Sequence, residues 1–349
     1  MSNKKMIRRF KTLFWIFEIY IQKIFNVKKR KTDEVALFDT SIESENLGDN
    51  IICSYCSKVI DEIFPRKCII RLSTHVMPET GKLEKLPYCT IKIVCGTNLM
   101  SPHFEEYSNW KMPRNLKGYQ NIITLGVGWG AYCEEISKVS RFVYKQILNV
   151  KGLHSVRDNY TEKKFHKMGI HNVVNTGCPT LWGLTPEHCA NIPGKKAKAV
   201  VTTITDYDQD VKNDQFMIET LLQEYQKVYV WIQGEWDLEY LNELVQLSKV
   251  TIIERSVEAY TKILDEEDVD YVGTRLHAGI HALNRGVRSI IVAIDNRAIE
   301  MGKDFLLPII YREQIEKNLS IMINEETKTE IQLPWDNIQK WKNQFSKII

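Results

Sequence analysis

The sequence predicts an α/β protein with two parallel-sheet domains in tandem and a cleft between them. Short apolar or β-branched runs alternate with amphipathic helices over residues 34–312, which is the pattern of a largely parallel sheet. The alternation pauses once, over residues 184–197, where Pro186, Pro193 and Gly194 indicate a linker. The chain has 349 residues, of which 44% are hydrophobic and 26% are charged, so it is long enough to bury two cores.

Residues 1–31 form a basic N-terminal segment. They contain ten Lys and Arg residues and a single acid, Glu18, which amounts to a charge of +9. Subtracting this +9 from the chain's +3 leaves −6 for the remainder. An acidic body argues against a nucleic-acid partner, and we expect none.

The same segment predicts an amphipathic helix over residues 10–25, whose apolar side chains recur at spacings of three and four. Glu18, Gln22 and Lys23 interrupt it too early for a membrane-spanning helix, and no signal-peptide cleavage site follows. Two interpretations remain open: a helix on the anionic inner face of the cell membrane, or a helix packed on its own domain or a second subunit. We therefore expect a cytoplasmic protein, with peripheral contact at the inner face of the membrane as one alternative.

The first domain is expected over residues 32–185. Its predicted strands are residues 35–38, 67–72, 91–95, 122–127, 153–156 and 171–174. Loops at the carboxyl ends of parallel strands are where ligands bind in such sheets, so the residues that follow each strand are the candidates for a site.

The first of these loops contains Asn46, Gly48 and Asp49. Gly48 suits a tight turn, and Asp49 or Asn50 suits the N-cap of a helix over residues 51–63. A capping role and a substrate-binding role are both open for these residues, because the loop follows the first strand of the sheet.

Two glycine-containing loops follow later strands. One contains Gly96 and Asn98, and the other reads GVGWG over residues 126–130. The second lacks the full GxGxxG dinucleotide fingerprint and is weak evidence for a nucleotide. It indicates either a close approach of the backbone to a ligand or to the neighbouring domain, or plain turn chemistry.

Arg157 and Asp158 end the next strand, before a predicted helix over residues 159–168 that Gly169 terminates. Arg157 either pairs with Asp158 or another carboxylate, or it faces a ligand. Its place at the end of a strand favours the second alternative.

The second domain is expected over residues 195–312, followed by a mostly helical tail over residues 313–349 whose final helix braces the domains. Its predicted strands are residues 200–204, 228–233, 250–253, 269–272 and 289–294, and its predicted helices are residues 214–225, 236–247, 257–265 and 276–284. Arg275 and His277 lie where one strand ends and a helix begins. The guanidinium group of Arg275 is permanently charged, and the imidazole of His277 titrates near neutrality. Together at a helix N-terminus, these two groups suit an anionic ligand.

The sequence predicts no metal site. His277 and His281 share a helix face, but Ala278 stands where the HExxH zinc motif has its glutamate, so core packing is favoured for His281. The eight cysteines are scattered, and the CxxC pair of Cys53 and Cys56 has no second pair. We expect reduced thiols in a cytosolic enzyme and no cofactor.

Three motifs together carry a resemblance to a known family. They are NLGD at residues 46–49, SVRD at residues 155–158, and TRLHA at residues 274–278 followed by Gly286. In this order and spacing they resemble the polysaccharide pyruvyl transferase family, over roughly residues 34–310. The resemblance implies two Rossmann-like domains in a GT-B-like arrangement, phosphoenolpyruvate as the donor, and a saccharide acceptor on which two hydroxyl groups become a pyruvate ketal.

The resemblance further implies a role in surface polysaccharide biosynthesis and a donor site that contains Arg157, Arg275, Leu276 and His277. A lipid-linked sugar is one candidate for the acceptor. Two guanidinium groups at a helix N-terminus suit the carboxylate and phosphate of phosphoenolpyruvate, which is a co-substrate rather than a cofactor. His277 is the side chain best suited to give a proton to the methylene carbon. The residues expected to contact substrate besides these are Asn46, Gly48, Asp49, Gly96 and Asn98.

The sequence departs from the family pattern in places that concern the acceptor more than the donor. Thr274 replaces a common serine, Cys178 stands where an acidic residue before proline is common, and the pair Asn296-Arg297 stands where a lysine is often seen. The glycine-rich signature after an early strand is reduced to Gly96 and its two successors.

Two other functions remain open. One is a nucleotide-sugar glycosyltransferase of the same architecture, in which Arg157 and Arg275 bind a diphosphate and residues 126–130 contact the acceptor. The other is a non-catalytic scaffold of a polysaccharide assembly complex, recruited through residues 1–31. Donor-binding measurements separate the first of these from a pyruvyl transferase.

Overall fold

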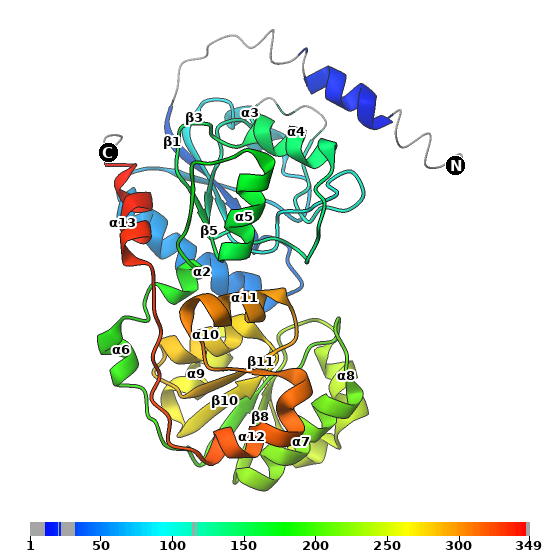
Figure 1. Cartoon of the computed structure of the whole chain (residues 1–349), viewed down its shortest axis with the longest axis vertical. Helices are drawn as coiled ribbons and strands as arrows, with labels where there is room; N and C mark the ends of the chain where they lie inside the picture. Colours follow the sequence, from blue (N-terminus) through cyan, green and yellow to red (C-terminus); the bar gives the residue numbers. More distant parts are fainter. Residues whose placement is uncertain (1–10, 20, 22–31, 114–115, 117, 347–349) are drawn as a thin grey trace.

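Two parallel sheets organise the chain in the computed structural model, which describes residues 11–19, 21, 32–113, 116 and 118–346. The first sheet has the order β2-β1-β3-β4, with β5 and β6 as a separate parallel pair, and the second has the order β12-β11-β10-β7-β8-β9. All pairings are parallel. Figure 1 shows the two α/β domains one above the other. The predicted fold class, an α/β protein with two Rossmann-like parallel-sheet domains, is confirmed.

The elements of the first domain alternate as the sequence predicts. They are β1 (Thr32–Asp39), α2 (Leu47–Ile63), β2 (Ile69–Ser73), α3 (Thr80–Lys85), β3 (Cys89–Cys95), β4 (Ile123–Leu125), α4 (Lys138–Ile147), β5 (His154–Val156), α5 (Asn159–Met168), β6 (Val173–Asn175), the 3-10 turn η1 (Pro179–Leu181) and α6 (Pro186–Ala190). The linker predicted over residues 184–197 thus contains the short helix α6.

The second domain and the tail follow the same alternation. Their elements are β7 (Ala199–Thr202), α7 (Val211–Glu224), β8 (Lys227–Trp231), α8 (Asp237–Leu244), η2 (Leu247–Lys249), β9 (Thr251–Ile253), α9 (Val257–Glu266), β10 (Val269–Gly273), α10 (Leu276–Asn284), β11 (Ser289–Ala293), α11 (Asn296–Phe305), β12 (Ile309–Tyr311), η3 (Arg312–Gln314), α12 (Ile315–Asn324) and α13 (Trp335–Asn343). Neither α11 nor β12 is predicted from the sequence.

The start of α2 differs from the prediction. The helix begins at Leu47, and its N-cap is Asn46, whose side chain accepts a hydrogen bond from the Gly48 nitrogen at 3.0 Å. The predicted turn at Gly48 and the predicted cap at Asp49 or Asn50 are therefore wrong. Asn46 caps the helix by accepting from one of the N–H groups that have no partner within the first turn. Asp49 therefore lies in the first turn without a capping role, and its carboxylate is available to other partners.

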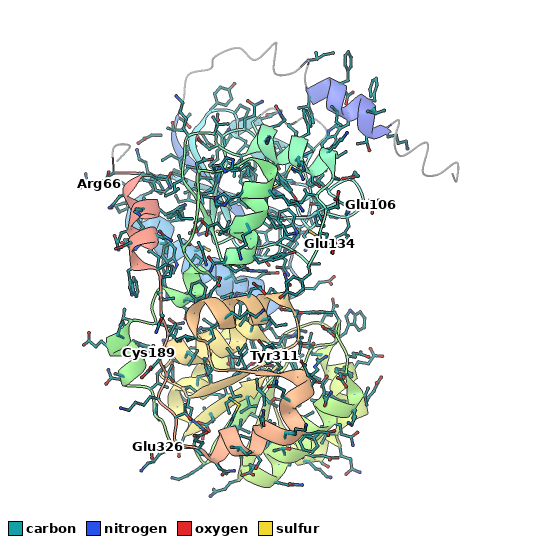
Figure 2. The ribbon with its side chains drawn as sticks, in the orientation of Figure 1. Arg66, Glu106, Glu134, Cys189, Tyr311 and Glu326 are labelled. Atoms are coloured by element: carbon teal, nitrogen blue, oxygen red, sulfur yellow. The ribbon has the colours of Figure 1, made fainter. Side chains whose placement is uncertain are left out.

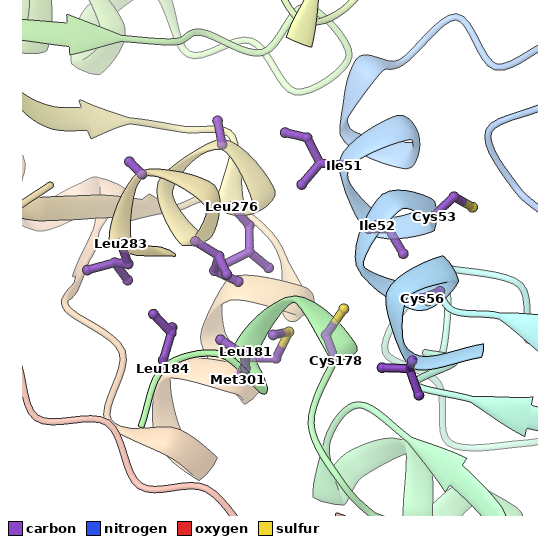
Figure 3. Packing of buried hydrophobic residues seen from close by; sticks show 14 of the residues in the cluster. Ile51, Ile52, Cys53, Cys56, Cys178, Leu181, Leu184, Leu276, Leu283 and Met301 are labelled. Atoms are coloured by element: carbon purple, nitrogen blue, oxygen red, sulfur yellow. The ribbon is translucent and has the colours of Figure 1, made fainter. Parts of the chain in front are cut away.

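Helix α2 joins the cores of the two domains. Ile51, Ile52 and Cys56 on this helix are buried in the same apolar cluster as Leu276 of α10 and Leu181 of η1. Figure 3 shows α2 facing α10 across this cluster. A large apolar contact between domains resists relative movement, so the cleft is held by a packed interface as well as by the linker.

The C-terminal tail touches both domains. Helix α12 packs on α7, and residues 325–334 then run back along the second domain to α13 on the first (Figure 1). The indole nitrogen of Trp341 in α13 donates to the Thr124 carbonyl at 3.1 Å. Figure 2 shows Glu326 at the second-domain end of the molecule and Arg66 at the first-domain end.

Part of the basic N-terminal segment forms a helix over residues 11–19, and the rest of residues 1–31 apart from residue 21 lies outside the described residues. Trp15 stacks on Phe104 with ring centroids 6.0 Å apart, which packs one side of the helix on the first domain. On the other side Leu13, Phe14 and Phe17 are 63%, 59% and 60% exposed. Within the described part of the chain, we find no helix with the length and apolarity that crossing a membrane requires.

Candidate active site

Three helices begin at one pocket between the domains. Helix α2 follows β1 in the first domain, and α10 and α11 follow β10 and β11 in the second. Their first turns place Asp49, His277 and Arg297 in the lining of this pocket. Helix N-termini carry partial positive charge and unpaired N–H groups, so the pocket favours an anion.

Two adjoining cavities form this region. The inner pocket is nearly filled by side chains, with a free volume of about 10 Å³. The outer cavity has a volume of about 580 Å³. Four residues line both and so mark the passage between them: Asn46, Asp49, Tyr207 and Arg297.

Most of the residues predicted for the site meet here. Those that line the inner pocket are Asn46, Gly48, Asp49, Arg275, Leu276 and His277. Asn98 lines the outer cavity. Gly96 does not line either cavity, and a side chain there would overlap with the Gly126 carbonyl, so this glycine serves the packing of two loops.

His277 is buried at the centre of the site. It is 6% exposed, and its Nε2 lies 3.7 Å from the Cys178 sulfur. Burial, followed by the positive charges of Arg297 and Arg157, lowers the pKa of His277 to about 3. The imidazole is therefore neutral near pH 7 in the ligand-free site. Burial raises the pKa of Cys178 to about 12, so its sulfur stays a thiol.

Arg157 has an unpaired buried donor; the residue lines neither cavity, but its charge acts on His277. Its Nε donates to Asp158 at 3.0 Å and its Nη2 to the Trp129 carbonyl at 3.2 Å, whereas its Nη1 is buried without a hydrogen-bond partner among the described residues. Of the two predicted alternatives for this arginine, the pair with Asp158 is observed, and contact with a ligand stays a prediction. A buried, unpaired charged donor is costly, which indicates an anionic ligand at this nitrogen.

The loop over residues 126–130 packs against the Arg157 side chain. A side chain on Gly128 would overlap with the Arg157 guanidinium, so the glycine lets the arginine lie against the backbone. The Trp129 carbonyl also accepts from Asn296 of the second domain at 3.1 Å. The loop therefore makes a close backbone approach to the neighbouring domain, one of the two alternatives open from the sequence.

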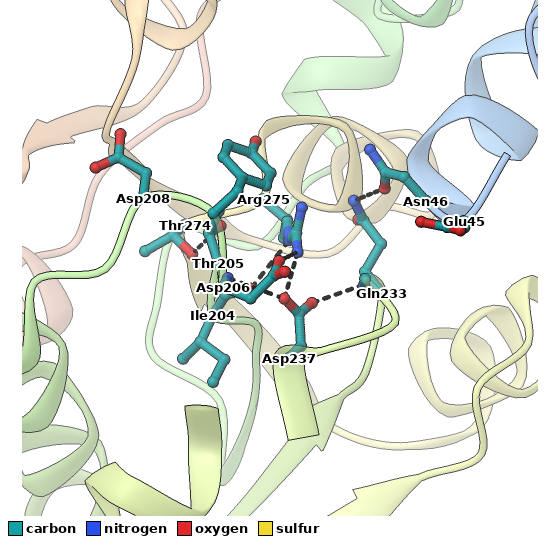
Figure 4. A network of polar contacts seen from close by, with 12 residues as sticks. Glu45, Asn46, Ile204, Thr205, Asp206, Asp208, Gln233, Asp237, Thr274 and Arg275 are labelled. Atoms are coloured by element: carbon teal, nitrogen blue, oxygen red, sulfur yellow. Dashed lines mark hydrogen bonds and ion pairs between the residues drawn. The ribbon is translucent and has the colours of Figure 1, made fainter. Parts of the chain in front are cut away.

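Arg275 is more constrained than the sequence suggests. Its Nη2 pairs with Asp206 at 2.9 Å and with Asp237, and its Nε donates to the Ile204 carbonyl at 3.0 Å. Figure 4 shows the guanidinium held between the two carboxylates. The ring of Tyr207 covers it, with the centroid 4.9 Å from Cζ. Two carboxylates already balance its charge, so Arg275 mainly fixes the loops that follow β7 and β8.

A direct contact between the domains closes the site beside Arg275. Gln233, after β8, donates from Nε2 to the Asn46 side chain at 2.7 Å, and its carbonyl accepts from the Leu47 nitrogen at 3.2 Å. A Cβ on Gly48 would lie 2.8 Å from this Nε2. Gly48 thus permits the close approach of Gln233, which explains why glycine suits this helical position.

Arg297 and Tyr207 line both cavities but were not predicted as site residues. Arg297 pairs with Asp295, the N-cap of α11, and donates to the Tyr207 hydroxyl. Arg297 follows β11 and stands near the start of α11, just as Arg275 follows β10 at the start of α10. This repetition would indicate a site residue in the sequence, but the sequence does not predict α11.

His281 lies away from these cavities. Its Nδ1 is 3.1 Å from the Tyr55 hydroxyl and its Nε2 is 2.9 Å from the Thr261 hydroxyl, so both ring nitrogens have structural partners. Cys53 and Cys56 are buried in α2. Among the described residues no group of three or more His, Cys, Asp or Glu side chains is arranged to hold a metal ion.

The buried histidines predict acid-sensitive stability. Burial lowers the pKa of His277 to about 3, and of His154 and His281 to about 4, against 6.5 for an exposed histidine. Below about pH 6.5 the unfolded chain therefore binds protons that the folded chain does not, and stability falls as the pH falls toward about 4.

Replacing His277 with glutamine should reduce the slope of unfolding free energy against pH by up to about 1.4 kcal/mol per pH unit. The slope is measured by urea unfolding of both proteins at several pH values between about 6.5 and 4. His75, whose pKa is raised, contributes the opposite slope, so His75→Gln should not flatten the curve. An identical slope for His277→Gln and the parent protein would show that His277 is not held neutral.

Comparison with known proteins identifies the family. Residues 46–296 match the family model described as polysaccharide pyruvyl transferase. No curated protein sequence matches the chain significantly. Among solved structures, the Methanocaldococcus jannaschii UDP-GlcNAc 2-epimerase in complex with UDP-GlcNAc and UDP is similar at 12% identity and a TM-score of 0.48, over 91% of this chain and 99% of that one. The wall teichoic acid polymerase TagF, as the H444N variant, is similar at 10% identity and a TM-score of 0.43, over 99% of this chain and 92% of that one. The family match covers well over half of the chain, and the chain belongs to the polysaccharide pyruvyl transferase family, whose members are transferases that modify polysaccharides.

Proposed function

We propose that this protein transfers the enolpyruvyl group of phosphoenolpyruvate to two hydroxyl groups of a sugar, forming a pyruvate ketal during surface polysaccharide biosynthesis. The observation that supports this most strongly is the unpaired Nη1 of Arg157. This nitrogen is buried, and the charge of its guanidinium lowers the pKa of His277, which lines the anion-favouring inner pocket, although Arg157 itself lines neither cavity.

In this proposal the donor lies near the start of α10 and α11, at the passage between the two cavities, because the inner pocket itself has a free volume of only about 10 Å³. Arg157 and Arg297 hold its carboxylate and phosphate, helped by backbone N–H groups of the two helices. Arg275 does not contact the donor in this proposal but keeps the loops after β7 and β8 in place. Phosphoenolpyruvate is a co-substrate, and we propose no cofactor or metal ion.

The reaction adds the first hydroxyl across the double bond. Its oxygen bonds to the central carbon, and the methylene carbon gains a proton and becomes a methyl group. The second hydroxyl then displaces phosphate at the same carbon, and its proton leaves with the phosphate. In this proposal His277 protonates the methylene carbon, with the negative charge of the bound donor raising its pKa against the burial and the two arginines that keep the imidazole neutral in the free protein.

Phosphate release tests this function against its rivals. The purified protein is incubated with phosphoenolpyruvate and a panel of UDP-sugars and p-nitrophenyl hexopyranosides that carry a free pair of hydroxyl groups. Phosphate release that requires both substrates supports the pyruvyl transferase. Release of UDP from the UDP-sugars without phosphoenolpyruvate would instead support the glycosyltransferase, and no turnover or donor binding would support the scaffold.

We also propose that the N-terminal segment contacts an anionic membrane. The exposed Leu13, Phe14 and Phe17 form an apolar face in a segment with ten basic residues and one acid. Anionic lipid attracts each nearby basic residue by about 1 kcal/mol, and the apolar face adds burial in the interface.

Co-sedimentation with vesicles measures this contact. The full chain should bind vesicles of phosphatidylcholine mixed with phosphatidylglycerol and not pure phosphatidylcholine vesicles, and the Phe14→Ser, Phe17→Ser double variant should bind severalfold less. Equal sedimentation of both proteins would contradict the proposal. A self-association of the parent chain that the double variant loses would instead assign the face to a second subunit.

A further inference from the structure

We propose that the outer cavity is the acceptor sugar subsite and that His75, paired with Asp49, is the base that takes the proton from the attacking hydroxyl. This inference rests on the proposed pyruvyl transfer and specifies its other substrate site. Nothing in the motifs NLGD, SVRD or TRLHA points to His75, which follows β2. In the sheet, β2 lies beside β1, so the loops after these two strands meet at one edge.

The outer cavity is built for a polyhydroxyl ligand. Its volume of about 580 Å³ suits one or two sugar rings better than the donor alone. Amides and carboxylates dominate its lining, and both can hydrogen-bond hydroxyl groups. The residues of these types are Glu43, Glu45, Asn46, Asp49, Asn98 and Asn109. The Asn98 side-chain oxygen is buried without a partner among the described residues, so it retains an unfilled acceptor.

An exposed aromatic ring completes this lining. Tyr107 is 67% exposed, and its hydroxyl donates to the Asn109 side chain at 2.6 Å, which orients the ring. A tethered ring with an open apolar face and a polar tip is the kind of surface on which a sugar ring packs. The second domain contributes Tyr207 and Arg297 to the same lining, so a sugar in this cavity contacts both domains.

His75 is oriented to accept a proton at Nε2. Its Nδ1 lies 3.3 Å from the Asn109 carbonyl. A carbonyl only accepts, so Nδ1 carries the hydrogen and Nε2 carries the lone pair of the neutral ring. Nε2 lies 3.5 Å from Asp49 Oδ2, which also accepts from the Ser44 hydroxyl at 2.7 Å. The buried carboxylate is therefore positioned to stabilise the imidazolium that forms when Nε2 takes a proton.

Charges around His75 agree with this role. Burial lowers the pKa of His75, but the hydrogen bond that the protonated ring donates to Asp49, the charge of Asp49 and the Asn109 carbonyl outweigh burial and the nearby Lys111, so the pKa lies above its usual value. Glu43, Glu45 and Arg297 face the same cavity. Asp49 also raises the pKa of His277, so this carboxylate acts on both histidines.

In the proposed step each histidine exchanges a proton with a different substrate. The hydroxyl proton of the acceptor moves to His75 Nε2 as the hydroxyl oxygen bonds to the central carbon of phosphoenolpyruvate. The methylene carbon receives its proton from His277. When the second hydroxyl displaces phosphate, its proton leaves with the phosphate. His75 releases its proton to water and His277 takes one from water, so both histidines return to the protonation states that they have in the donor complex.

Steady-state kinetics on the full chain test the inference, with phosphoenolpyruvate and the panel acceptor that turns over fastest. His75→Gln should lower kcat by about 10²-fold or more and remove the acid limb of the kcat/KM profile for the acceptor. Asp49→Asn should lower kcat and shift that limb to lower pH, because the imidazolium loses its carboxylate. His103→Gln, an exposed histidine of the same domain, should match the parent protein.

Calorimetric titration with phosphoenolpyruvate separates this inference from the proposed function. His75→Gln should bind the donor within about threefold of the parent protein, which also shows that the variant is folded. If the parent protein turns over and His75→Gln keeps its kcat and its acid limb, the inference is overturned while the proposed function stands. If the parent protein neither binds phosphoenolpyruvate nor releases phosphate with any acceptor, the proposed function fails and the inference with it.

Discussion

Replacing His277 with glutamine should lower kcat by about 10²- to 10⁴-fold and leave donor binding nearly unchanged. Glutamine has a similar size and still fills the space beside the Cys178 sulfur, but it cannot give a proton to the methylene carbon. Donor affinity depends chiefly on the guanidinium groups and helix N-termini, which the substitution does not touch. Phosphate release gives kcat, and calorimetry gives the donor affinity.

His281→Gln is the matched control for this prediction. It lies on the same helix one turn away, and its ring nitrogens contact Tyr55 and Thr261 rather than the cavities. We expect it to lower stability and to leave kcat within a fewfold. Near-normal turnover by His277→Gln, or an equal loss in both variants, would remove the acid role from His277.

Replacing Arg157 with lysine should weaken phosphoenolpyruvate binding by about 10- to 100-fold, the equivalent of one charged hydrogen bond. The guanidinium serves Asp158, the Trp129 carbonyl and the proposed donor at once, through three different nitrogens. A lysine keeps the charge but offers a single nitrogen, so it cannot serve all three. Calorimetric titration with phosphoenolpyruvate measures the loss.

Gly128→Ala should produce a similar loss without changing any charge. Its methyl group would overlap with the Arg157 guanidinium and displace it. Gly130→Ala is the control in the same loop, since a Cβ there meets only the Met100 carbonyl at an ordinary 3.4 Å. If Arg157→Lys and Gly128→Ala bind the donor as the parent protein does, the unpaired nitrogen of Arg157 is not part of the donor site.

The strand ends that carry the site could be predicted because the sheets are parallel. The stretch over residues 269–295 predicts strand, helix and strand, and α10 has the predicted bounds. The start of α2 could not be placed, because Asn46, Asp49 and Asn50 are all good capping residues and only the hydrogen bond to the Gly48 nitrogen distinguishes them.

Side-chain partners that come from distant strands could not be predicted. The sequence predicts that Arg275 is available to bind an anionic ligand. Its carboxylate partners, Asp206 and Asp237, lie 69 and 38 residues away in the chain, so the sequence does not reveal these pairs. His75 likewise meets Asp49 only because β2 pairs with β1, a strand order that the sequence does not reveal. In both cases sheet order decides which charged groups meet.

The fate of the central carbon of phosphoenolpyruvate tests the proposed function most directly. The parent protein is incubated with phosphoenolpyruvate labelled with ¹³C at that carbon and with the sugar panel, and the products are followed by carbon NMR. The proposed function predicts that the label becomes a ketal carbon bonded to two sugar oxygens, with one phosphate released for each ketal. A label that remains in phosphoenolpyruvate, or that appears only in free pyruvate, would contradict it.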